Sequence, residues 1–286
     1  MRDPFREGLA AGWKHIDASQ LAVDLPIEAD VVIIGSGAGG GVTAEILAAN
    51  GLKVVIVEEG PLRTSSDFKM REAEAYPDLY QESAARKTAD KAINILQGRC
   101  VGGSTTVNWT SSFRTPPRTL QWWQSAWGLK RLGVDAMAPW FAAMEQRLHV
   151  GLWPIPPNEN NAALARGAAQ LGIPVAVIPR NVKMCWNLGY CGMGCPTNAK
   201  QSMLLTTLPA ALTNGAMLIS RLRAERFEFS GNKAISLTAL AMKADGIHPS
   251  SVKVTLRARH FVLAGGAVNS PALLLRSKAV DPHGLL

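Results

Sequence analysis

Residues 30–60 read DVVIIGSGAGGGVTAEILAANGLKVVIVEEG, and this stretch decides the fold. The apolar run 31–34 is typical of a buried strand, and after it come Gly35, Gly37 and Gly40 in the spacing G-x-G-x-x-G, then a helical pattern over 41–50. A second apolar run ends at Glu58, 18 residues after Gly40. This order of elements predicts a unit that binds an adenine dinucleotide: a strand, a glycine turn, a helix, a second strand and an acid.

Each of these residues has an expected physical role. Gly35 allows a tight turn, Gly37 leaves room for a pyrophosphate, and Gly40 lets the helix approach the strand closely. The phosphates are expected on free N–H groups at the positive end of the helix dipole. Glu58 is expected to accept hydrogen bonds from both ribose hydroxyls and to repel a 2′-phosphate.

A second glycine-rich segment distinguishes between the two common dinucleotides. Residues 97–108 read QGRCVGGSTTVN. Gly102, Gly103 and Ser104 offer backbone donors to a second part of a long ligand, and Asn108 places a side-chain amide nearby. A surface turn would account for the two glycines but not for the polar residues after them. NAD folds rarely need such a loop, so the segment favours FAD.

Two segments resemble signatures of the glucose-methanol-choline (GMC) family of flavin oxidoreductases. The first is residues 98–108, and the second is residues 266–277, GAVNSPALLLRS. The second segment follows an apolar run and Gly265, and another tight approach to the flavin is expected at Gly265. Lys278 departs from the family pattern, which usually has glycine there. The resemblance runs from about residue 29 to 279.

The resemblance implies an FAD-dependent alcohol dehydrogenase or oxidase, in which flavin takes hydride from the CH–OH carbon and a histidine takes the hydroxyl proton. It also implies that the catalytic histidine lies in a later segment of such proteins. No histidine here matches a catalytic position, so no catalytic residue is predicted; the histidines are His15, His149, His248, His260 and His283. The alternative is a non-catalytic flavin-binding fragment that needs a second half or a partner chain.

Three cysteines form a C-x5-C-x3-C pattern, and closely spaced thiolates of this kind can bind soft metals or iron–sulfur clusters. Cys185, Cys191 and Cys195 are therefore candidate ligands of an iron–sulfur cluster, with zinc as a second alternative. Similar loops in the family lack a cluster, so structural thiols, or a disulfide between Cys191 and Cys195, are the other interpretations. The main prediction is no metal.

The composition and charge of the chain indicate which classes of binding partner to expect. The chain has 286 residues, 47% of them hydrophobic and 18% charged, as expected of a globular α/β protein. The net charge of +8 is scattered and forms no dense basic run, which argues against nucleic acid. Charged residues interrupt the longest apolar runs, and the first residues are not an apolar signal region, so we expect no membrane span and a cytoplasmic location. The expected partner is a small alcohol, with an unknown electron acceptor.

The predicted fold is α/β: a Rossmann-like FAD-binding domain, a parallel sheet with helices on both faces, interleaved with part of an α+β substrate domain. Helices are expected at 70–92, 134–148, 161–171 and 202–213, and strands at 173–178, 216–220, 225–229, 234–242 and 252–263. Clustered tryptophans around 122–140 suggest a packed subdomain. The expected domains are an N-terminal extension (1–29), an FAD-binding domain with the aromatic-rich insertion (30–155), a cysteine-loop and partial substrate domain (156–215), and the return to the FAD-binding domain (216–286).

Overall fold

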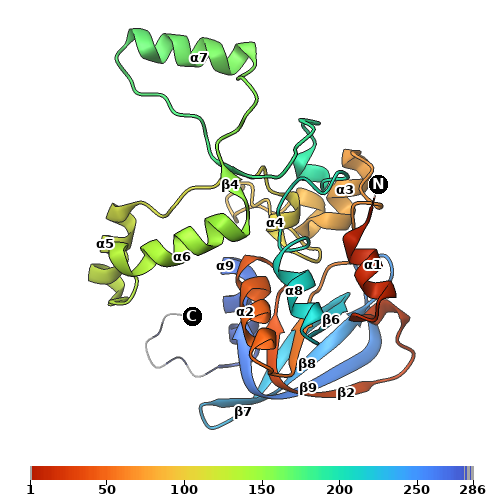
Figure 1. The fold of residues 1–286 in the computed structure, drawn as a ribbon. Coiled ribbons are helices and arrows are strands. Elements are labelled where there is room, and N and C mark those ends of the chain that lie inside the picture. The colour runs from red at the N-terminus through yellow and green to blue at the C-terminus, as the bar shows by residue number, and fades with distance from the viewer. Residues whose placement is uncertain (1, 280, 282–283, 285–286) are drawn as a thin grey trace. The chain divides into compact units, whose positions relative to one another are not determined.

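The computed structural model describes residues 2–279, 281 and 284 (Figure 1). The chain divides into two compact units. Unit 1 combines Met1–Asn108 with Trp186–Leu286, and unit 2 is Trp109–Cys185. The domain boundary predicted between residues 155 and 156 lies inside unit 2.

Unit 1 is built on a seven-stranded sheet in the order β1-β6-β3-β2-β9-β8-β7. The first five strands in this order are parallel to one another, whereas β8 pairs antiparallel with both β9 and β7. The predicted α/β class with a mostly parallel sheet is therefore confirmed. The strands are β1 (Lys14–Asp17), β2 (Leu25–Ile34), β3 (Val54–Val57), β6 (Met217–Ser220), β7 (Leu222–Ser230), β8 (Lys233–Met242) and β9 (Pro249–Leu263).

The central strands are apolar on both faces because both faces are covered. Val32 and Val55 belong to a core shared with Phe227 and Leu237 of the antiparallel strands. The alternation of side chains along a strand directs Ile33 to the opposite face, where α2 packs. A Cβ on Gly40 of that helix would lie 3.2 Å from Ile33 Cγ2. Antiparallel strands therefore contribute to covering one face, and α2 covers the other.

Unit 1 contains the helices predicted over 41–50 and 202–213, as α2 and α8, and further helices that were not predicted. The helices of unit 1 are α1 (Pro4–Ala10), α2 (Ala38–Ala49), α3 (Glu72–Leu79), α4 (Ser104–Val107), α8 (Thr207–Thr213) and α9 (Gly266–Arg276), with the 3-10 turns η1 (Ala18–Gln20), η2 (Gln81–Ala84) and η3 (Cys191–Met193). The single helix predicted over 70–92 is wrong. Pro77 lies near the end of α3, and the chain then takes positive φ angles at Glu82, Ser83 and Ala84. A helix cannot continue through such residues, so 80–98 forms an irregular hairpin, with isolated bridges between Tyr80 and Gly98 and between Lys87 and Asn94.

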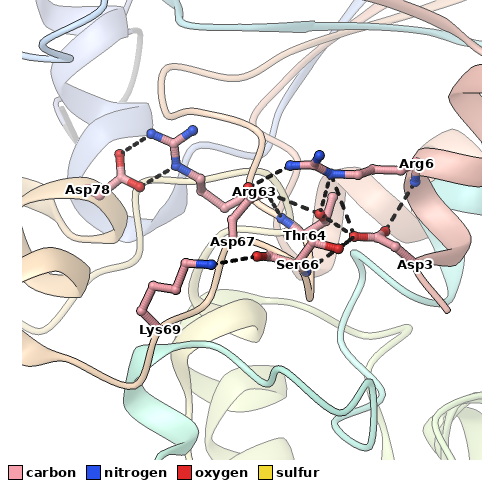
Figure 2. Close-up of polar contacts among 8 residues, drawn as sticks. All are labelled: Asp3, Arg6, Arg63, Thr64, Ser66, Asp67, Lys69 and Asp78. Atoms are coloured by element: carbon pink, nitrogen blue, oxygen red, sulfur yellow. Dashed lines mark hydrogen bonds and ion pairs between the residues drawn. The ribbon is translucent and has the colours of Figure 1, made fainter. Parts of the chain in front are cut away.

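The first residues are part of unit 1. Strand β1 pairs with β6, and β2 begins at Leu25, six residues before the predicted run. Asp3 caps α1 and also accepts hydrogen bonds from Thr64 Oγ1 (2.6 Å) and Ser66 Oγ (2.7 Å) in the segment after β3. Figure 2 shows this network, in which Arg6 also pairs with Asp67 at 2.6 Å. The sequence predicted an extension here, but polar contacts and strand pairing make it part of the sheet domain.

Unit 2 contains α5 (Pro117–Trp127), α6 (Val134–Arg147), β4 (Val150–Gly151), α7 (Glu159–Gln170) and β5 (Arg180–Asn181). The strand predicted at 173–178 does not form. The predicted packed tryptophan core is also wrong, because Trp122, Trp127 and Trp140 are each more than half exposed. Within these three helices only Leu120 is buried, so unit 2 has little core of its own.

None of the helices in the described part of the chain combines the length and apolar character that crossing a bilayer requires.

Candidate functional site

A cavity of about 660 Å³ lies in unit 1 at the carboxyl ends of the parallel strands β2, β3 and β9. This volume is within the range of sites for drug-sized ligands and cofactors. In open α/β sheets, ligands bind outside the carboxyl ends of the strands. Six of the predicted cofactor residues line this unit 1 cavity: Gly35, Gly37, Glu58, Gly103, Ser104 and Gly265.

The N-terminus of α2 faces the cavity through Gly37, Ala38 and Gly39. Gly37 is the N-cap residue, and no side chain caps the helix. A Cβ built on Gly37 would meet no protein atom closer than 3.8 Å, so the protein itself leaves this space open. Uncapped N–H groups at a helix N-terminus, beside space that a side chain would fill, suit an anion such as a diphosphate.

Gly35 and Gly40 have structural roles beside this anion site. Gly35 has a φ of 101°, a conformation that favours glycine, and an added Cβ would lie 2.4 Å from the Ala264 carbonyl oxygen. Gly40 does not line the cavity. Its Cβ would lie 1.8 Å from the Gly35 carbonyl oxygen, so its missing side chain brings α2 close to the turn, which is the role expected from the sequence.

Glu58 is buried and already bonded to protein donors. Its Oε2 accepts from the Ser36 backbone N–H (3.0 Å) and hydroxyl (2.6 Å), and its Oε1 accepts from the Gly60 N–H (3.0 Å). Burial raises the pKa of the Glu58 carboxyl; the hydrogen bonds from Ser36 and Gly60 lower it in part, and the charge of Glu59 raises it. Glu58 therefore connects the phosphate turn to the end of β3 as well as bordering the cavity.

The second glycine loop joins the same network. The Gly102 N–H donates to Ser36 Oγ at 3.0 Å, while Gly103 and Ser104 line the cavity at the start of α4. Gly102 and Asn108 do not line it. Asn108 is exposed, and its backbone carbonyl accepts a hydrogen bond from Lys200 Nζ. The amide predicted to meet the flavin thus does not reach the cavity in this structure.

A polar wall of the cavity comes from the 80–98 hairpin and from α9. Arg86 donates to the side-chain oxygens of Gln97 (2.9 Å) and Asn269 (3.0 Å), and more weakly to Gln81 (3.4 Å). These four side chains all line the cavity. The sequence analysis missed Gln81 and Arg86 because it placed them in a helix over 70–92, and it quoted the segments that contain Gln97 and Asn269 without assigning these two residues to the site. Arg86 also forms an ion pair with Glu82, 2.9 Å from its Nε, so its charge is partly offset before any anionic ligand is attracted.

The cysteine loop shows no metal site. Among the residues that the structure describes, no group of three or more His, Cys, Asp and Glu side chains is arranged to hold a metal ion. Cys185 belongs to unit 2, whereas Cys191 and Cys195 belong to unit 1. All four cysteines are thiols, so the structure contains no Cys191–Cys195 disulfide. The iron–sulfur and zinc interpretations receive no support.

Histidines are absent from the described lining of the cavity. His15 lies on β1, His149 in unit 2, and His248 beside Asp245 at a turn. His260 is exposed on β9. His283 lies outside the described residues. The lining of the cavity, as far as the structure describes it, thus contains groups suited to binding a cofactor and no imidazole.

Comparisons with known proteins agree with this geometry. A family model described as GMC oxidoreductase matches residues 76–284, and an FAD binding domain model matches residues 30–70. A long-chain-alcohol oxidase of Arabidopsis thaliana, FAO4B, is 34% identical over 90% of this chain and 35% of its own length. A GMC-type oxidoreductase of Sinorhizobium fredii, y4nJ, is 31% identical over 89% of this chain and 50% of its own.

Solved structures show the same fold. The pyridoxine 4-oxidase from Mesorbium loti superimposes with a TM-score of 0.66 at 22% identity, covering 87% of this chain and 52% of that one. The chain thus spans about a third to a half of the length of the relatives it matches. Since the GMC model covers well over half of the 286 residues, the chain belongs to the GMC oxidoreductase family.

Proposed function

We propose that this chain is the FAD-binding part of an oxidoreductase that acts on the CH–OH group of an alcohol. The observation that carries the proposal is the cavity, which brings the uncapped N-terminus of α2, the acid Glu58 and the second glycine loop together in unit 1. The family match and the FAD binding domain match at residues 30–70 support the same cofactor.

Different residues of the cavity would contact different parts of the cofactor. The α2 N-terminus at Gly37–Gly39 would hold the diphosphate, and Glu58 would bind the adenosine ribose. Gly103 and Ser104, with Gly265 at the start of α9, would border the flavin part. When bound, FAD supplies the hydride acceptor for alcohol oxidation. This chain's own residues bind and orient it and leave proton removal to a group outside the described cavity lining.

For the substrate we propose a long-chain alcohol. Support comes from Arabidopsis proteins named long-chain-alcohol oxidases, which are 34% and 30% identical to this chain. The alternative is a flavin-binding piece that is inactive until a second half or a partner chain completes the site. No histidine lines the cavity among the described residues, and this observation favours the alternative for the isolated chain.

Purified residues 1–286, refolded or expressed with FAD, test the proposal. The expected result is stoichiometric flavin absorbance that stays with the protein through gel filtration. NAD and NADP serve as competitors and should not displace FAD. A folded chain that binds no FAD, or that prefers NAD, would overturn the proposal.

A further inference from the structure

Glu58 cannot satisfy both adenosine ribose hydroxyls by itself. A carboxylate offers about four lone-pair sites. Three of them are taken by the Ser36 N–H, the Ser36 hydroxyl and the Gly60 N–H, at 2.6 to 3.0 Å. Both contacts from Ser36 fall on Oε2, so only one site remains, on Oε1. A ribose with two free hydroxyls therefore needs a second acceptor.

Glu59 is the neighbouring carboxylate, and it also lines the cavity. Its side chain is 25% exposed, so it is not sealed from the cavity that it borders. Its protein contacts are weak: Gln81 Nε2 lies 3.5 Å from one carboxylate oxygen, and Arg99 Nη1 lies 3.9 Å from the other. Unlike Glu58, Glu59 has acceptor capacity left for a ligand.

The surroundings hold Glu59 in place and offset its charge. The Glu58 N–H donates to the Ile219 carbonyl, and the Glu58 carbonyl accepts from the Leu222 N–H, both at 2.9 Å, so β6 and β7 fix the backbone at the end of β3. Arg99 is buried, and its positive charge beside Glu59 reduces the repulsion between two adjacent carboxylates. Leu222 and Ala224 line the cavity as well, and they provide apolar surface for a purine.

We propose that Glu59 is a second ribose-binding residue, which accepts one hydroxyl of the adenosine ribose while Glu58 accepts the other. This inference rests on the proposed function. Two carboxylates at this position also bar a ribose that carries a 2′-phosphate, because like charges would meet at close range.

The test pairs protein variants with ribose analogues. Isothermal titration calorimetry would measure FAD, ADP, 2′-deoxy-ADP and 3′-deoxy-ADP binding to residues 1–286 and to Glu59→Ala and Glu59→Gln. We expect Glu59→Ala to weaken FAD and ADP binding about tenfold, the value of one hydrogen bond to a charged group. One of the two deoxy compounds should bind Glu59→Ala as well as ADP does, because its missing hydroxyl is the one that Glu59 accepts.

Glu28→Gln is the matched control. It removes the same charge from an exposed site on β2 outside the cavity, and it should leave binding unchanged. Equal affinity of the wild type and Glu59→Ala for FAD and ADP would overturn the role of Glu59, and so would a Glu59→Ala variant that still discriminates against both deoxy compounds. If the wild-type chain binds neither FAD nor ADP, the proposed function fails, and this inference fails with it.

Discussion

At the scale of single residues, the glycines of the first motif have two separate roles. The protein leaves space beside Gly37, whereas it leaves none beside Gly40, where a Cβ would lie 1.8 Å from a backbone oxygen. The motif therefore contains one position that serves the ligand and one that serves packing. Substitution by alanine can separate them.

We predict that Gly37→Ala folds normally but binds FAD at least tenfold more weakly, because its methyl group occupies the space of the diphosphate. Its free energy of unfolding without FAD should stay within about 1 kcal/mol of the wild type. Gly40→Ala is the contrasting variant, and overpacking should lower its stability by about 1–3 kcal/mol or more. Urea unfolding and flavin titration measure the two effects. Undiminished FAD affinity in Gly37→Ala would place the phosphates elsewhere.

At the scale of elements, strand β1 depends on a histidine contact that responds to pH. The Nε2 of His15 lies 2.9 Å from Ser220 Oγ on β6, the strand with which β1 pairs. Burial lowers the pKa of His15 below its ordinary value of 6.5, and the nearby charge of Asp17 opposes this only in part. The folded state therefore prefers the neutral imidazole.

The sign of the pH effect follows from this preference. Since the unfolded chain takes up a proton near pH 6.5 and the folded chain only at lower pH, the contribution of His15 to stability is complete above 6.5. It is lost as the pH falls from 6.5 toward the folded pKa, by at most about 1.4 kcal/mol per pH unit. We predict that the melting temperature falls less between pH 7.5 and 5.5 in His15→Asn than in the wild type. If the melting temperatures of the wild type and His15→Asn change in parallel with pH, His15 has the same pKa in the folded and unfolded chain.

A second feature at this scale is the 80–98 hairpin, which Arg86 ties to α9. The sequence over 70–92 is rich in helix formers, yet the α-helix that forms there, α3, ends at Leu79, before the hairpin. Backbone hydrogen bonds cross the hairpin, for example from the Gln81 N–H to the Gln97 carbonyl (2.9 Å), and the Arg86 side chain adds contacts to Gln97 and Asn269. The hairpin thereby becomes a wall of the cofactor cavity.

At the scale of the whole molecule, we expect the chain to bind FAD without catalysing alcohol oxidation at an enzyme-like rate. The described cavity holds groups for a cofactor but no histidine. We predict that purified residues 1–286 bind FAD yet oxidise long-chain alcohols at least 100-fold more slowly than a typical enzyme, because general base catalysis alone is worth about 100- to 10,000-fold. Dye reduction under saturating alcohol measures the rate. Rapid turnover would reveal a base in this chain, and His248→Ala and His260→Ala would be the first variants to make.

The sequence by itself determined the α/β class, the first glycine motif and the elements around it. These follow from local causes: apolar runs become buried strands, and backbone sterics require glycine at a tight turn such as Gly35. The helix of 134–148 and the strands from 216 onward were also predictable, because their periodicity lies within each segment.

Only the tertiary structure decided which side chains meet at the cavity. Ser36 occupies two of the acceptor sites of Glu58, and Gln97 approaches Gly265 at 3.4 Å across 168 residues of sequence. Neither contact has a local signal, since each depends on how distant segments pack. The same reason explains why Asn108, which suits a flavin loop by its sequence, does not line the cavity, whereas Glu59 and Arg86 do.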